Sequence, residues 1–119
     1  MRLIKFALLL FTVALPLLAA CTPNDGFTPS QRQSARAIET TLRQYIGAEY
    51  DIITSPGEAN TVNVDVQWHA ERGPGSSGLE LMVPEEADHA ILNMLRQSLP
   101  AEHLPYVGRI YFQRIELED

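Results

Sequence analysis

Residues 61–69 alternate without a break between apolar and polar side chains, and this alternation constrains the fold more than any other feature of the chain. The apolar phase holds Val62, Val64, Val66 and Trp68, and the polar phase holds Asn63, Asp65, Gln67 and His69. Successive side chains of a β-strand point to opposite faces of its sheet. The pattern therefore predicts a strand over Thr61–His69, in a sheet with one face in the core and the other in water.

A helix is predicted on each side of this strand. The first begins at Thr28-Pro29-Ser30-Gln31, which offers an N-cap residue, a proline for the first helical position and the glutamine of a capping box. Gly47 suits its C-terminal end. The second begins at Pro84-Glu85-Glu86 and ends before Pro100. The predicted buried faces are Ala35, Ile38, Leu42, Tyr45 and Ile46 in the first helix and Ala87, Ile91, Met94, Leu95 and Leu99 in the second.

Further strands are predicted over residues 49–54, 79–83 and 108–117. The last has apolar residues in both phases, which indicates either a central strand or a bulge. Residues 71–78 hold three glycines and a proline and are predicted to form a mobile loop, and 101–105 form a connection. The order α-β-β-β-α-β predicts an α+β fold, with two helices on one face of a mainly antiparallel three- to four-stranded sheet. In element order alone it is similar to small periplasmic α+β modules, among them the αββαβ pattern of BON domains.

An apolar stretch of about 15 residues, Phe6–Ala20, follows two basic residues near the N-terminus. It is shorter than the roughly 20 residues that a membrane-spanning helix needs and has the anatomy of a secretory signal peptide. Its end, Leu18-Ala19-Ala20-Cys21, resembles the lipobox of bacterial lipoproteins. The resemblance implies cleavage between Ala20 and Cys21, a diacylglycerol on the Cys21 thiol and acylation of the new amine, which together give a stable anchor. An uncleaved anchor helix and an ordinary cleaved signal peptide with a chance cysteine are the alternatives.

The chain is thus expected to have three parts: a cleaved signal peptide at 1–20, a lipidated tether at 21–27 and a single α+β domain at 28–119. About six extended residues reach only some 20 Å, so we expect the domain to lie close to the membrane that holds the lipid. Thr22 follows the cysteine, where an aspartate retains enterobacterial lipoproteins in the inner membrane. The resemblance therefore favours the outer membrane, facing the periplasm.

Composition excludes two classes of function. The 99 residues from position 21 onward hold all 15 acidic residues and seven arginines but no lysine, a formal charge of −8. Binding to nucleic acid is therefore not expected, because it needs clustered cationic side chains to neutralise phosphates. Cys21 is the only cysteine. With a lipid on its thiol, the protein has no disulfide to staple the fold and no thiol for catalysis.

The three histidines, at 69, 89 and 103, stand 20 and 14 residues apart, so no pair has the spacing that places two metal ligands on one helix face. His89 is close in sequence to Glu85, Glu86 and Asp88. We interpret these carboxylates as the solvated start of a helix, and a weak cation site is the alternative. No metal and no cofactor is predicted.

Catalytic residues are not predicted either. Glu71 and Glu80 flank the glycine-rich loop, and the sequence shows nothing that would bury them and separate their pKa values, as acid–base chemistry requires. Ser76 and Ser77 lie within the loop, but the segment lacks the GxSxG motif of a nucleophile elbow and the Lys-Ser/Thr of a phosphate-binding loop.

The sequence therefore predicts a non-enzymatic interaction or accessory module of the cell envelope, held to the membrane by Cys21 and bound to an envelope protein. The predicted interaction surface consists of Asn63, Asp65, Gln67 and His69 with the loop tyrosine Tyr106, beside the loop at 71–78. The alternative is a protein that binds a small ligand or a cell-wall fragment, or hydrolyses one, for which His69, Glu71 and His89 are the candidate residues.

Overall fold

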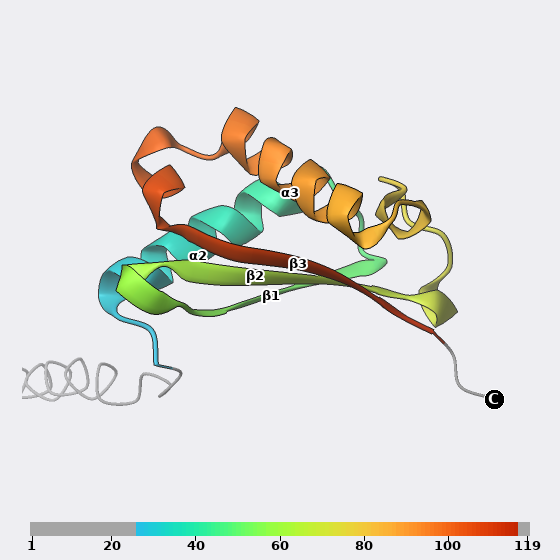
Figure 1. Cartoon of the computed structure of the whole chain (residues 1–119), viewed down its shortest axis with the longest axis horizontal. Helices are drawn as coiled ribbons and strands as arrows, with labels where there is room; N and C mark the ends of the chain where they lie inside the picture. The colour runs from blue at the N-terminus through green and yellow to red at the C-terminus, as the bar shows by residue number, and fades with distance from the viewer. Residues whose placement is uncertain (1–25, 117–119) are drawn as a thin grey trace, which may run out of the picture.

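The computed structural model describes residues 26–116 and has an α+β fold, as predicted. Two α-helices and a three-stranded sheet make up its regular structure (Figure 1). The helices are α2 (Pro29–Arg43) and α3 (Pro84–Ser98), and the strands are β1 (Tyr50–Pro56), β2 (Val62–His69) and β3 (Val107–Ile115). Cys21 and the lipobox lie outside the described residues. No helix within residues 26–116 has the length and apolar character needed to cross a membrane.

The predicted capping box is present at the start of α2. The Thr28 hydroxyl accepts the Gln31 N–H at 3.1 Å, and the Gln31 side chain accepts the Thr28 N–H at 2.9 Å. The helix ends at Arg43, earlier than the predicted stop at Gly47. Tyr45 therefore leaves the helical face and is 40% exposed, so its predicted burial is wrong. Its hydroxyl is hydrogen-bonded to Ser98 of α3.

The sheet is mixed rather than mainly antiparallel. Its order is β1-β2-β3, with β1 antiparallel and β3 parallel to the central strand β2. The last strand is therefore at an edge, and the prediction that it could be central is wrong. The alternative prediction of a bulge agrees with a shift in register, since Val62 pairs with Val107 but Val64 pairs with Ile110.

The strand predicted over 79–83 does not form. Leu79–Leu81 is a turn of 3₁₀-helix, η3, preceded by Gly78 in the left-handed conformation at φ +74°. Leu79 and Glu80 are both buried whereas Leu81 is 83% exposed, and two consecutive inward side chains are incompatible with strand alternation. The connection at 101–105 is also 3₁₀-helix, η4 (Ala101–Tyr106). Regular helices and strands therefore follow one another as α-β-β-α-β within residues 26–116.

Both helices lie on the same side of the sheet (Figure 1) and share one hydrophobic core with it. The inward phase of β2 is buried as predicted, with Val62, Val64 and Val66 at 0% exposure. Trp68 packs against this core in part, and its indole N–H donates to the Gly73 carbonyl at 2.8 Å. The fully buried helical residues are Ile38 and Leu42 in α2 and Ala87, Ile91 and Leu95 in α3.

Candidate functional site

The polar row Asn63, Asp65, Gln67 and His69 lies on the face of β2 opposite the buried valines. No described helix covers this face, which we call the open face of the sheet (Figure 1). The row is only partly exposed, because neighbouring strands flank it on both sides. Ile53 of β1 and Tyr111 of β3 pair with Asp65 across the sheet, and they are 45% and 44% exposed. The open face thus presents two large hydrophobic side chains around a polar centre.

Hydrogen bonds order the side chains of the open face. The Asp65 carboxylate accepts from the Gln67 amide at 3.1 Å and from the Gln113 amide at 3.2 Å. The Arg109 guanidinium donates to the Tyr111 hydroxyl at 3.1 Å. These contacts reduce the conformational entropy that a docking partner would otherwise have to remove from these side chains.

His69 lies at one end of the row and is held in a polar cluster. Its Nε2 is 2.9 Å from the Asp51 carboxylate and its Nδ1 is 3.9 Å from that of Glu71. Arg72 donates to the other Asp51 oxygen at 2.8 Å, and this hydrogen bond holds the pKa of Asp51 below its ordinary value. The cluster ties β1 to the segment after β2.

Other predicted site residues are not part of this row. Tyr106 is the last residue of η4 and is 37% exposed, and no hydrogen bond or ion pair among the described residues joins it to β2. His89 is on α3, on the helical side of the sheet, so the structure brings His69 and Glu71 together but not His89. Within residues 26–116, no group of three or more His, Cys, Asp or Glu side chains is placed to hold a metal ion.

The loop at 71–78 is tied to the core through a buried carboxylate. Glu80 is only 6% exposed, so the expectation from the sequence that nothing buries this side chain is wrong. The Tyr50 hydroxyl donates to one Glu80 oxygen, and the Gly75 N–H donates to the other at 2.9 Å. Burial acts to raise the pKa of Glu80, but these hydrogen bonds outweigh it and leave the pKa lowered. Burial, followed by the hydrogen bond to Glu80, raises the pKa of Tyr50.

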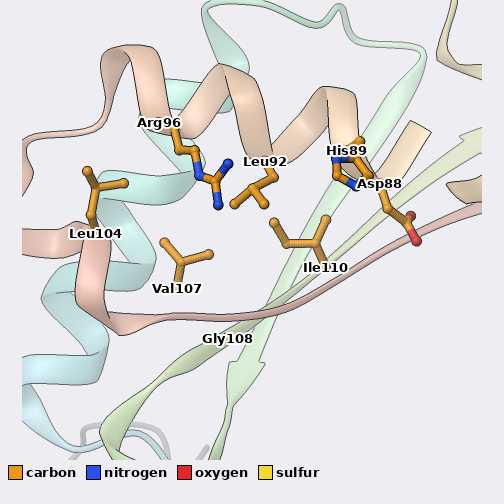
Figure 2. Close-up of a pocket in the computed structure, with 8 residues that line it drawn as sticks. All are labelled: Asp88, His89, Leu92, Arg96, Leu104, Val107, Gly108 and Ile110. Atoms are coloured by element: carbon orange, nitrogen blue, oxygen red, sulfur yellow. The ribbon is translucent and has the colours of Figure 1, made fainter. Parts of the chain in front are cut away.

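A groove between α3 and β3 was missed by the sequence analysis (Figure 2). It has a volume of about 520 Å³, within the range of ligand sites. Its lining consists of Asp88, His89, Leu92, Arg96, Leu104, Val107, Gly108 and Ile110. The only signals in the sequence were the apolar residues in both phases of the last strand and an arginine off the buried face of the helix.

Two charged side chains of this groove are incompletely paired. Asp88 Oδ1 is buried and has no hydrogen-bond partner within residues 26–116. Desolvation raises the pKa of Asp88, although the backbone N–H of Phe112 acts in the opposite direction. Arg96 forms no hydrogen bond or ion pair with any residue in the described part of the chain. The groove therefore offers a ligand the exposed Arg96 guanidinium, which has no partner among the described residues.

Comparison with models of protein families, with curated proteins and with solved structures finds no match to this chain.

Proposed function

We propose that this protein is a membrane-anchored lipoprotein that faces the periplasm and acts as a non-enzymatic interaction module of the cell envelope. A partner protein docks on the open face of the sheet. The observation that carries the proposal is the exposure of Tyr111 and Ile53, at 44% and 45%, on a rigid sheet face that no described helix covers. Exposed large hydrophobic side chains surrounded by polar groups are typical of protein-binding surfaces.

The position of the proposed lipid anchor, Cys21, is consistent with docking of an envelope protein on the open face. Gly26 lies beside Pro56 at the end of β1, because a Cβ on Gly26 would be 3.3 Å from the Pro56 ring. Gly26 is five positions after Cys21 in the sequence, and an extended chain of five residue steps reaches about 18 Å at most. The turn between β1 and β2 is therefore expected near the membrane, with the open face extending away from it toward envelope proteins.

Tyr111 and Arg109 are the expected anchors of the interface. Tyrosine and arginine are enriched among residues that dominate binding energy, and the hydrogen bond between these two already holds the tyrosine hydroxyl in place. Both come from β3, so the rigid sheet fixes their spacing. Removing the Tyr111 ring is expected to weaken partner binding at least about tenfold.

The test is capture of cross-linked partners by a tagged full-length chain in the cells that produce it. We expect one near-stoichiometric envelope protein with the wild type, and its loss in Tyr111→Ala and in the unanchored variant Cys21→Ser. Tyr45→Ala is the matched control, because Tyr45 is similarly exposed, at 40%, but packs on the helical side. Equal capture by Tyr111→Ala and Tyr45→Ala would refute docking on the open face.

Binding of a small ligand or cell-wall fragment is a second candidate function, and the groove between α3 and β3 favours it. Titration of the full-length chain with purified muropeptides tests this candidate. Amide NMR shifts confined to residues 88–96 and 107–110 would support it, and unchanged spectra would reject it.

A further inference from the structure

The free edge of the sheet forms one wall of the groove between α3 and β3. Because β3 is an edge strand, alternate residues direct their backbone N–H and C=O groups away from β2. The Arg109 N–H points toward β2, where it donates to the Asn63 side chain at 2.9 Å. Ile110 follows Arg109, so its backbone groups point to the opposite, free edge, inside the groove.

The groove is closed at one end by the chain itself. Residues 99–106 connect the end of α3 directly to the start of β3, and Leu104 of η4 lines the groove there. An extended polypeptide in the groove cannot continue past this connection and must end beside it. Figure 2 shows Arg96 projecting from α3 into this closed end, beside Leu104 and Val107.

The charges of the groove match the end of a polypeptide. Arg96 has no partner among the described residues and stands where the chain must stop. A guanidinium pairs well with a carboxylate, and a free α-carboxylate is present only at a C-terminus.

We propose that this groove binds the last three or four residues of a partner polypeptide, which adds to the free edge of β3 with its terminal carboxylate on Arg96. This site lies on a different surface from the open face. It binds the C-terminal residues of a partner protein, whereas the open face binds a folded surface. Leu92 and Ile110 form its apolar floor, as Figure 2 shows.

The length and the direction of the bound peptide follow from the positions of Asp88 and Arg96 on α3. Asp88 and Arg96 are eight residues apart on α3, about 12 Å along its axis, which matches three to four residues of extended chain. The terminal carboxylate is at the Arg96 end, where β3 begins. The bound segment therefore runs from Asp88 to Arg96, antiparallel to β3.

The test uses the purified full-length chain in detergent and a complete library of L-tetrapeptides with free C-termini. We expect selected apolar peptides whose affinity falls about ten- to a hundredfold when the carboxylate is amidated, or in the variant Arg96→Gln. Arg36→Gln is the matched control, since Arg36 is an exposed arginine on α2. Tyr111→Ala should leave peptide affinity unchanged, which separates this site from the proposed docking face.

Strand addition is tested on the peptide rather than on the protein. N-methylation of the residue that pairs with Ile110 should abolish binding, because it removes a backbone donor that β-pairing requires. Absence of any library peptide that binds, equal binding of amides, or full affinity in Arg96→Gln would overturn the proposal. Binding of cell-wall muropeptides alone would also overturn it and would favour the second candidate function.

Discussion

Replacing Tyr50 by phenylalanine tests whether a single buried hydroxyl holds the loop at 71–78 on the core. Tyr50 is 0% exposed. Its hydroxyl donates to Glu80 and accepts the Leu79 N–H at 3.2 Å. The substitution removes only the hydroxyl oxygen. It keeps the aromatic ring of residue 50, whose centroid is 6.3 Å from that of the Phe112 ring.

The expected cost follows from the two groups that lose their partner. An unsatisfied buried group costs about 1–3 kcal/mol, and charged groups lie at the upper end of that range. The Glu80 carboxylate keeps the Gly75 N–H, so the two losses together are expected to lower the free energy of unfolding by about 3 kcal/mol. For a domain of this size, that corresponds to a fall in Tm of roughly 12–24 °C.

The assay is urea unfolding of the full-length chain in detergent, followed by far-UV circular dichroism at pH 7. Tyr45→Phe is the matched control, because it removes a hydroxyl from an exposed side chain and should change stability by less than about 0.5 kcal/mol. Equal midpoints for the two variants would refute the claim that the hydroxyl of Tyr50 fastens the loop.

Three further predictions concern the same fold. The folded-state pKa of Glu80 lies below its ordinary value of 4.5, so the stabilisation by this carboxylate is present above pH 4.5 and is lost as pH falls through the lowered pKa. The free energy of unfolding should therefore fall less steeply on acidification in Glu80→Gln than in the wild type. Gly75→Ala should destabilise by about 2 kcal/mol in urea unfolding, because a Cβ there would lie 2.0 Å from the Tyr50 hydroxyl oxygen. Ser76→Ala, at an exposed neighbour, is its control and should have no measurable effect. Thr28→Ala removes the N-cap of α2 and should cost about 1 kcal/mol in melting experiments, whereas Thr28→Ser should not.

Local patterns correctly predicted the elements that are determined by residues close together in the sequence. The strict alternation over residues 61–69 placed three valines in the core and the polar row on the opposite face. The capping box at Thr28 and Gln31 was predictable because its partners are three residues apart. Both features depend on near neighbours along the chain, so a single sequence is sufficient to recognise them.

Features that depend on distant residues could not be predicted. Glu80 looked solvated because Tyr50, its hydrogen-bond donor, is 30 residues away in sequence. The strand expected at 79–83 is instead a 3₁₀ turn in which Leu79 and Glu80 are both buried. Parallel pairing of β3 with β2, and therefore the groove along its free edge, arises from the way α3 crosses the sheet. Apolar alternation does not specify which edge a strand joins.

The most direct test of docking on the open face is site-specific photo-cross-linking in living cells. A photoreactive residue replaces Tyr111 in one full-length variant and Gln33, exposed on α2, in the other. The account predicts one discrete adduct from position 111, identifiable by mass spectrometry, and none from position 33. No adduct from position 111, or the same adducts from both positions, would contradict it.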